Sequence, residues 1–410
     1  MKKTTFAVMG LGNRGRCYVT NLLEFPEKME ITAIADPRES CRETYNAMLH
    51  LPEDRVFHSG EELLAQPKLA DVMVICTQDR QHKDHAIAAM ERGYDLLLEK
   101  PISNKLEDVR QIAEAANRLG RKVLVCHVLR YTPFYRTVKR LLDQGAVGRI
   151  LNVEAAEHVS CWHMAHAYVR GQWRRKDESS PIILAKCCHD MDIILWLTGK
   201  KPLSVTSIGS LDYFCKENMP QGAPLRCTDG CPAEATCPYH SVNFYLPRIP
   251  AWPTNNMLPN PNEENIRQLL DTTRYGICVF QQDNDVVDHQ QVQIQLSDSV
   301  TASFSLNALH TRSTRTIRIG GTKGELWGDM KDQKVYWQPH GGEAECIEIG
   351  GDMAGHGGGD KGLVADAIDY FSGKTDIPGI TTLDDSAASH YLAFAAEESR
   401  LLEGQKIQLA

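Results

Sequence analysis

The fold of this chain is decided by one stretch, Gly10-Leu11-Gly12-Asn13-Arg14-Gly15. An apolar run precedes it and apolar residues at helical spacing follow it, so we expect a strand, a tight turn and a helix. The first glycine permits the turn, the second lets the backbone approach a pyrophosphate, and the third allows close helix packing. Asp36 ends the next β-rich run, where dinucleotide-binding folds hold the ribose. We therefore predict a dinucleotide-binding domain.

Strands and helices alternate through the first 130 residues, which predicts a parallel, doubly wound sheet. Asn104 and Glu107 form a candidate capping box for one of the helices. The expected strands are 4–9, 30–35, 70–76, 94–98 and 122–126, and the expected helices include 82–92 and 104–119. We assign residues 1–130 to an NAD(P)-binding Rossmann domain.

Residues 131–410 show a different pattern, with consecutive strands joined by tight turns, which is typical of an antiparallel sheet. The chain is therefore predicted to be an α/β Rossmann domain followed by an α+β domain with a large open, mainly antiparallel sheet. Within it, residues 212–265 hold nine prolines and four cysteines, which favours a long ordered loop or insertion over regular elements. The expected strands are 149–159, 202–211, 289–296, 300–309, 314–320, 323–327, 333–338 and 345–349, and the expected helices are 133–142, 181–197, 360–372 and 385–403.

Composition narrows the function. A length of 410 residues, 42% of them hydrophobic and 24% charged, indicates a globular protein of two domains. The net charge of −8, without clustered basic residues, argues against nucleic acid or an anionic membrane as partner. No apolar run is long enough for a membrane span, and glycines and arginines interrupt the apolar start, so we expect no secretory signal. Together with the odd count of 13 cysteines, this predicts a cytoplasmic protein acting on small molecules.

Three motifs in the first half resemble the glucose-fructose oxidoreductase, inositol dehydrogenase and MocA family, known as Gfo/Idh/MocA. They are 10–15, Thr77 to His82, and Glu99-Lys100-Pro101 at the end of the fourth strand. The resemblance continues at 145–150, 321–326 and 395–400 and so covers nearly the whole chain. It implies NAD(P)-dependent oxidation or reduction of sugars, cyclitols or their derivatives. It also implies that the antiparallel sheet supplies oligomer contacts, as in a homodimer or homotetramer.

The cofactor site is expected to bind NAD. The charge of Asp36 would repel a 2′-phosphate, whereas Arg38, two residues on, can reverse the preference toward NADP. His82 is assigned a structural or cofactor-side role. The expected cofactor-binding residues are Gly10, Gly12, Asn13, Arg14, Gly15, Asp36, Arg38, Thr77, His82, Glu99 and Lys100.

The family's catalytic lysine falls on Lys100, where a strand end would bring its ammonium to a developing alkoxide. The family's helical Asp-x-x-x-His-x-x-Asp motif is represented by residues 185–192. His189 and Asp192 match the motif, and Ala185 replaces the first aspartate. We expect His189 to be the base and Lys186, three residues earlier on the same helix face, to act in place of the aspartate.

Two further segments are expected to contact substrate, although a solvated loop and a glycine-rich turn are the plainer interpretations. One is the aromatic segment 162–174, and the other is His356-Gly357-Gly358-Gly359-Asp360, which resembles a segment of sugar-acting relatives. The expected substrate residues are Arg130, Trp162, His166, Tyr168, Arg170, Trp173, Asp192, His356 and Asp360.

A structural zinc site is one interpretation of Cys227, Cys231 and Cys237, with His240 or Cys215 as a fourth ligand. A loop of free thiols is the alternative, since the spacing is not the usual paired knuckle. No catalytic metal is indicated.

Together the motifs predict an NAD-dependent oxidoreductase acting on a secondary alcohol or ketone of a sugar, glycoside or cyclitol. The alternative is a redox-neutral, NAD-dependent glycosidase that oxidises, eliminates, adds water and reduces again. A non-catalytic sugar sensor fits less well because Lys100 and His189 are both present.

Overall fold

The computed structural model describes residues 3–258, 260–351 and 354–409, and its first half forms a parallel sheet of six strands in the order β3-β2-β1-β4-β5-β6. Pro259, one of the nine prolines counted in 212–265, lies outside the described residues. The strands are β1 (Thr4–Met9), β2 (Met29–Ala35), β3 (Val56–Phe57), β4 (Val72–Ile75), β5 (Asp95–Leu98) and β6 (Val123–Val125). Helices α1 (Asn13–Leu22), α2 (Glu39–Leu49), α3 (Gly60–Ala65), α4 (His82–Glu91) and α5 (Leu106–Leu119) cover the sheet.

The predicted capping box of α5 is wrong. Lys105, not Asn104, occupies the N-cap position, and its side chain makes no capping bond. Ser103 takes over the turn, because its hydroxyl accepts a hydrogen bond from the amide of Lys105 and donates one to Asp108 at 3.0 Å. The predicted capping box therefore does not form, and the side chain of Ser103 bonds to the first turn of the helix in its place.

A second sheet of nine strands, in the order β14-β13-β12-β11-β7-β10-β9-β8-β15, forms the other half. Its neighbours pair antiparallel except β7 and β10, which are parallel, so the predicted fold class is confirmed. The strands are β7 (Ile150–Ser160), β8 (Pro202–Ser210), β9 (His289–Leu296), β10 (Thr301–His310), β11 (Thr314–Gly321), β12 (Gly324–Asp329), β13 (Lys334–Pro339), β14 (Glu345–Glu348) and β15 (Ile407–Gln408).

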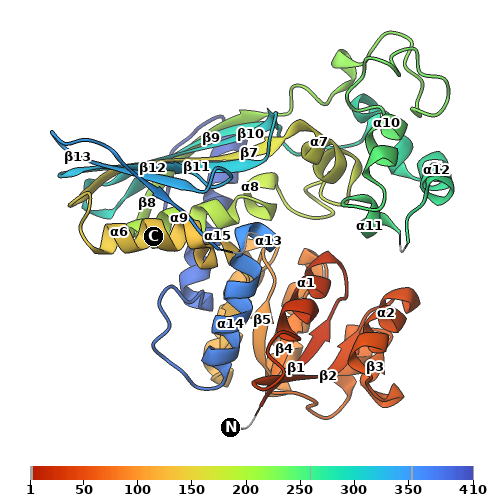
Figure 1. Cartoon of the computed structure of the whole chain (residues 1–410), viewed down its shortest axis with the longest axis horizontal. Coiled ribbons are helices and arrows are strands. Elements are labelled where there is room, and N and C mark those ends of the chain that lie inside the picture. The colour runs from red at the N-terminus through yellow and green to blue at the C-terminus, as the bar shows by residue number, and fades with distance from the viewer. Residues whose placement is uncertain (1–2, 259, 352–353, 410) are drawn as a thin grey trace.

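Helices α6 (Pro133–Asp143), α9 (Cys188–Thr198) and α15 (Leu383–Leu401) lie along one face of this sheet (Figure 1). Alternate side chains of β9 are buried and exposed, as expected when helices cover a single face. None of the helices in the described part of the chain has both the length and the apolar character to cross a bilayer.

The helix predicted over 181–197 is broken. The structure has α8 (Ile182–Ala185) and then α9, with Lys186 and Cys187 in the turn between them. Lys186 and His189 therefore do not share one continuous helix face. At the break the Ala185 carbonyl accepts a hydrogen bond from Lys100 Nζ at 2.8 Å. The break thus joins the second half of the chain to the end of β5.

The last helices return to the first sheet. α13 (Ala354–Gly357) is a distorted turn, and α14 (Gly359–Phe371) packs beside α1, as Figure 1 shows. Leu363 and Val364 of α14 share a core with Phe6 and Val8 of β1. The C-terminal segment therefore contributes to both halves of the molecule.

Residues 212–265 were expected to lack regular elements, and this is wrong for two short helices within them and for a third that begins at Glu263 and runs past residue 265. The helices are α10 (Ser241–Tyr245), α11 (Thr254–Met257) and α12 (Glu263–Thr272). Asn262 and Asn265 cap the start of α12 reciprocally, and the segment has its own small core of Phe244, Tyr245, Ile266 and Leu270. Figure 1 shows these helices beyond the end of the large sheet, past α7 (Cys161–Met164).

Candidate active site

One cavity of about 1750 Å³ lies between the two halves and is lined by both. The glycine turn and the end of β5 form one wall, and α9, segment 162–173 and residues 250–258 and 260–261 contribute to the other. Of the predicted site residues, the structure brings together at its lining Gly10, Gly12, Asn13, Arg14, Asp36, Arg38, Thr77, Glu99, Lys100, Trp162, His166, Tyr168, Trp173, Lys186, His189 and His356. It does not place Gly15, His82, Arg130, Arg170, Asp192 and Asp360 at that lining.

The glycine turn is shaped to accept a bulky anion. Gly10 has φ +89°, and a Cβ added there would lie 2.5 Å from the carbonyl oxygen of Cys76. A Cβ on Gly15 would lie 1.9 Å from the carbonyl oxygen of Gly10, so α1 can approach the turn only with glycine there. At Gly12 the only atom within 4 Å of an added Cβ is Nη2 of Arg38, 3.7 Å away. The bare backbone of Gly12, at the N-terminus of α1, therefore fits a pyrophosphate.

Asp36, at the end of β2, is already bonded within the protein. Its carboxylate accepts from the amide of Leu11 at 2.6 Å and from the guanidinium of Arg38 at 2.8 and 2.9 Å. Burial alone would raise the pKa of Asp36, but these hydrogen bonds lower it below its usual value. Arg38 is half exposed and lines the cavity, so the same guanidinium is available to a group bound there.

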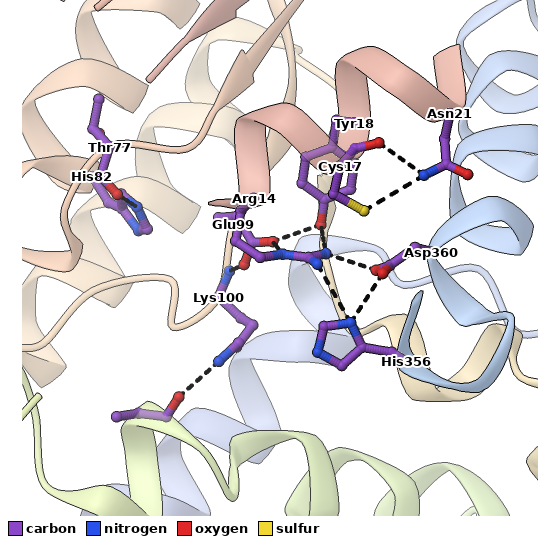
Figure 2. A network of polar contacts seen from close by, with 11 residues as sticks. Arg14, Cys17, Tyr18, Asn21, Thr77, His82, Glu99, Lys100, His356 and Asp360 are labelled. Carbon is purple, nitrogen blue, oxygen red and sulfur yellow. Dashed lines mark hydrogen bonds and ion pairs between the residues drawn. The ribbon is translucent and has the colours of Figure 1, made fainter. Parts of the chain in front are cut away.

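Arg14 and Glu99 organise the centre of the site (Figure 2). Arg14 Nε lies 2.5 Å from Glu99, and its Nη2 donates to Tyr18 at 2.6 Å and to Asp360 at 2.8 Å. Burial opposes ionisation of Glu99, yet the nearby Arg14 and Lys100 hold the pKa of Glu99 below its usual value. The second carboxylate oxygen of Glu99 accepts from the amide of Lys100 at 2.8 Å. Glu99 thus orients the backbone that carries Lys100.

His82 is buried away from the cavity. Its ring nitrogens lie 2.8 Å from the carbonyl oxygen of Pro101 and 3.1 Å from that of Thr77. Figure 2 shows His82 and Thr77 well apart from the ammonium of Lys100. His82 thus bridges the ends of β4 and β5, and its structural or cofactor-side role stays a prediction.

His189 is buried in α9 and faces the cavity. Burial, together with the charges of Lys100 and Arg315, holds the pKa of His189 well below its usual value, so the ring is neutral at physiological pH. Its Nδ1 has no hydrogen-bond partner among the described residues. A neutral imidazole on the cavity wall is able to accept a proton from substrate.

Sequence reasoning missed Glu157 and Arg315. Lys186 Nζ lies 3.3 Å from Glu157, and Arg315 bridges Glu157 and Asp190, the latter at 2.8 Å. Glu157 and Arg315 are paired across β7 and β11. The sequence offered one signal, a charged residue on each of two strands that otherwise contribute to the core. Only the register of β7 and β11 brings Glu157 and Arg315 together. Burial raises the pKa of Asp190 to about 6.

Two predicted substrate residues, Arg130 and Asp192, require correction. They form a buried bidentate ion pair at 2.7 and 2.6 Å, and neither lines the cavity. The guanidinium and the carboxylate satisfy each other, so neither presents a free group to substrate. Their pair joins the segment before α6 to α9, the helix that carries His189.

Arg170 also differs from its prediction. It is 1% exposed, and its guanidinium donates to the carbonyl oxygens of Ile277 and Tyr239, both at 2.9 Å. It thus ties the π-helical turn Ala165–Arg170 to the insertion and does not line the cavity. Asp360 is likewise set back from the cavity, behind Arg14 and His356.

An aromatic group forms the wall opposite the glycine turn. Trp162 contacts Trp252 with ring centroids 5.2 Å apart, and His166 stacks on Tyr275 at 5.5 Å. Trp252 and Tyr275 were missed because they lie 90 and 109 residues after their contact partners Trp162 and His166 and carry no motif. Both line the same cavity.

The predicted zinc ligands do not converge. Among the residues that the structure describes, no group of three or more His, Cys, Asp or Glu side chains could hold a metal ion. Cys227 instead lies 3.6 Å from Nη2 of Arg170, and its carbonyl oxygen lies 2.9 Å from a ring nitrogen of His240. All 13 cysteines are free thiols.

Two protein-family models match this chain. The model of the GFO/IDH/MocA oxidoreductase family, with an NAD-binding Rossmann fold, matches residues 4–127, and that of the GFO/IDH/MocA C-terminal domain matches residues 135–249. The chain belongs to the Gfo/Idh/MocA family. The resemblance found in its motifs is thereby confirmed.

Among curated members of this family, the oxidoreductase YteT of Bacillus subtilis is 24% identical over 95% of this chain and 93% of its own length. The NAD⁺-dependent scyllo-inositol 2-dehydrogenase of the same organism is 26% identical, over 50% of this chain and 57% of its own. A 2,7-anhydro-N-acetylneuraminate hydratase of Escherichia coli is 24% identical, over 50% of this chain and 52% of its own. The chain thus spans about half the length of the latter two relatives.

Solved structures of the family share the fold. Levoglucosan dehydrogenase, in complex with NADH, superimposes with a TM-score of 0.73 at 16% identity and full coverage of both chains. The aldose-aldose oxidoreductase of Caulobacter crescentus gives a TM-score of 0.69 at 17% identity, again with full coverage of both chains.

Proposed function

We propose that this protein transfers a hydride between NAD and a secondary alcohol or ketone of a sugar, glycoside or cyclitol. The observation that carries the proposal is that Lys100, from the end of β5, and His189, from α9, line one cavity beside the glycine turn. The two side chains come from opposite halves of the chain, and their types suit proton removal and alkoxide stabilisation.

The cofactor site fits a dinucleotide in its shape. The open backbone at Gly12 suits the pyrophosphate, and Asp36 stands where a ribose hydroxyl would be held. When bound, NAD supplies a hydride acceptor at the substrate carbon. We favour NAD because the ionised carboxylate of Asp36 would repel a 2′-phosphate. The half-exposed guanidinium of Arg38 would attract one, so NADP is the alternative cofactor.

Each side chain at the reacting end has a defined task in this proposal. His189 takes the hydroxyl proton, because its neutral ring lines the cavity. Lys100 donates to the substrate oxygen, exchanging its bond to the Ala185 carbonyl for one to the developing alkoxide. Lys186, held by Glu157, adds a second positive charge to the same region.

The test uses the purified protein, NAD, and a panel of free sugars, inositols and 4-nitrophenyl glycosides. NADH formation and nitrophenol release are followed together at 340 and 400 nm. We expect NADH to form in amounts stoichiometric with the substrate oxidised, without release of nitrophenol. Absence of NADH and of nitrophenol release across the panel, in protein that binds NADH, would refute the proposal.

A redox-neutral reaction is the second candidate, including the glycosidase alternative. The observation that favours it is a second histidine, His356, on the same cavity wall as Lys100. Relatives named as hydratases are consistent with such chemistry in the family. Release of nitrophenol without net NADH would select this candidate over the first.

The proposal further includes a Rossmann domain over residues 1–130, a substrate and oligomerisation domain over 131–410, a homodimer or homotetramer, and a cytoplasmic location. Light scattering of the purified protein measures the oligomeric state, and a single-subunit mass would refute that part.

A further inference from the structure

We propose that Lys186 and Arg315 form a subsite for a carboxylate, so that the substrate is a sugar acid such as a hexuronate or one of its glycosides. The inference rests on the proposed function, since it names the substrate class of the same cavity. It gives a task to Arg315, which hydride transfer does not use, and it gives Lys186 a binding partner in the substrate. Both side chains line the cavity.

The first observation is the charge on the cavity lining. Among the described residues, six lysines and arginines line the cavity against three carboxylates, which are Asp36, Asp79 and Glu99. Asp36 and Glu99 are each bonded to an arginine of the same lining, and Asp79 accepts from two serine hydroxyls. Lys186 and Arg315, in contrast, have no carboxylate partner on the described lining itself. An acidic substrate would supply one.

The carboxylate partners of both cations lie behind the cavity wall. Nζ of Lys186 is 3.3 Å from Oε1 of Glu157, with which Arg315 pairs through Nη2. Nε of Arg315 donates to Oδ1 of Asp190 at 2.8 Å. Glu157 and Asp190 are 1% and 4% exposed and do not line the cavity. The two buried carboxylates therefore hold two cations in place at the wall, so little side-chain entropy is lost when a ligand binds them.

Both cations keep N–H groups that no described residue uses. Arg315 bonds through Nε and Nη2, and its Nη1 makes no hydrogen bond to a described residue. Lys186 has three N–H groups and a single ion pair within the described part of the chain. Oδ2 of Asp190 is buried and likewise has no hydrogen-bond partner among the described residues. The spare N–H groups therefore do not bond to the acceptor behind the wall, and they are available to one in the cavity.

A ligand with one negative charge suits this pair better than a ligand with two. The carboxylates behind the wall already offset much of the charge of Lys186 and Arg315, so little is left for a dianion such as a phosphate ester. A guanidinium bonds a carboxylate through two parallel N–H groups, and a neighbouring ammonium adds a point charge. A carboxylate on a sugar is therefore the anion that these donors fit.

The subsite adjoins the groups proposed to act on the substrate. Asp190, which holds Arg315, follows the proposed base His189 directly in α9. Burial lowers the pKa of His163, and the nearby charges of Lys186 and Arg315 lower it further. His163 itself lines the cavity among the aromatic residues of the opposite wall. The pair thus neighbours both the base and the aromatic wall, so a sugar ring held at His189 would present its carboxylate there.

The first experiment compares pairs of substrates that differ only in the carboxylate. The pairs are 4-nitrophenyl β-D-glucuronide with the β-D-glucoside, and D-galacturonate with D-galactose, and the rate of NADH formation gives kcat/KM for each. In the wild type the acid should exceed its neutral partner about 100-fold, the effect expected of two charge-assisted hydrogen bonds. An equal kcat/KM for both, with NADH formed, overturns the inference and leaves the proposed function intact.

Two variants and one control assign this preference to residues. K186Q removes a charge, while R315K keeps the charge that Glu157 and Asp190 require in the folded protein but loses the planar fork. Each should lower the ratio of acid to neutral kcat/KM about tenfold, and this ratio cancels any general loss of activity. K201Q, at an exposed lysine outside the cavity lining, should keep the wild-type ratio. A wild-type ratio in both K186Q and R315K overturns the inference.

Binding without turnover separates this inference from the proposed function. Calorimetry of the protein loaded with NADH measures the affinity for D-glucuronate, D-glucose and D-glucose 6-phosphate. We expect a Kd about 100-fold lower for glucuronate than for glucose, and about tenfold weaker glucuronate binding in R315K. This result in a protein that forms no NADH from any sugar would refute the proposed function alone. Equal affinity for glucuronate and glucose, or tighter binding of the 6-phosphate, would overturn the inference.

Discussion

The two walls of the cavity are built in different ways. On the Rossmann wall, Gly10 to Arg14, Asp36 and Lys100 each lie just after a strand of one parallel sheet, so short motifs set their positions. On the opposite wall, His189, Trp162 and Trp252 come from α9 after the helix break, from the short helix α7 and from the insertion. This difference indicates a division of roles. The Rossmann wall, built from short motifs, suits a cofactor, and the opposite wall, built from distant segments, suits the selection of a substrate.

The largest effect is expected on the Rossmann wall, at Lys100. Replacing it by methionine removes the cation that we propose meets the developing alkoxide, and it should lower kcat about 1000-fold. NADH binding, measured by fluorescence, should persist because the glycine turn is untouched. K105M, at an exposed lysine at the start of α5, is the matched control. Full activity in K100M would contradict the site assignment.

The next effect concerns stability and lies behind the opposite wall. D192N leaves Arg130 buried without its charged partner and should lower the free energy of unfolding by about 3 to 5 kcal/mol. D271N, at an exposed aspartate of α12, should change it by less than about 0.5 kcal/mol. Urea unfolding measures both. A large rise in KM with unchanged stability would instead return Asp192 to substrate binding.

A third effect, on acid stability, concerns Asp360, which lies behind Arg14 and His356. Because the folded-state pKa of Asp360 is lowered, the unfolded chain binds more protons in acid. Its contribution is therefore fully present above about pH 4, the ordinary range of an aspartate, and is lost as the pH falls below it. D360N should be less stable than wild type at pH 7, with the difference narrowing toward pH 3. A constant difference in unfolding free energy would contradict this pairing.

A smaller effect tests cofactor choice. R38A removes the guanidinium that would meet a 2′-phosphate and frees the oxygens of Asp36 that it now occupies. The ratio of kcat/KM with NADP to that with NAD should fall about tenfold. Steady-state rates with each cofactor measure it. An unchanged ratio would show that Arg38 does not contribute to the preference.

The smallest effect is expected on the aromatic wall. W252A removes an aromatic face of the cavity wall, which we propose stacks on substrate, and should raise KM about fivefold, with kcat nearly unchanged. W327A, at a tryptophan stacked on Tyr336 in the large sheet and outside the cavity lining, should leave KM unchanged. Equal KM values in W252A and wild type would show that Trp252 makes no stacking contact with substrate.

The residues that were predictable share a physical feature. Gly10, Gly12 and Asp36 act through the local backbone of a strand end, and that geometry follows from sequence spacing. Arg130 and Asp192 were assigned to substrate because a charge in a motif looks the same whether it faces a cavity or a buried partner. Their 62-residue separation conceals the ion pair that decides between the two.

The opposite wall shows the same limit for residues that were missed. Glu157 and Arg315 meet only through the register of β7 and β11. Trp252 reaches the cavity because the insertion folds into short helices over a small core of its own. Neither contact leaves a periodic or motif signal, since each depends on how distant segments pack.

The sequence by itself determined the two-part fold, the cofactor turn, and the presence of Lys100 and His189, because spacing and periodicity act over short stretches of chain. Tertiary structure alone decided which charges face the cavity and which neutralise each other. It brought the ammonium of Lys100 to the Ala185 carbonyl at the helix break. It also placed the carboxylate of Asp360 beside the ring of His356. Lys100 and Ala185 are 85 positions apart, and His356 and Asp360 are 4 positions apart. In both contacts the conformation of a turn, and not the spacing in the sequence, brings the atoms together.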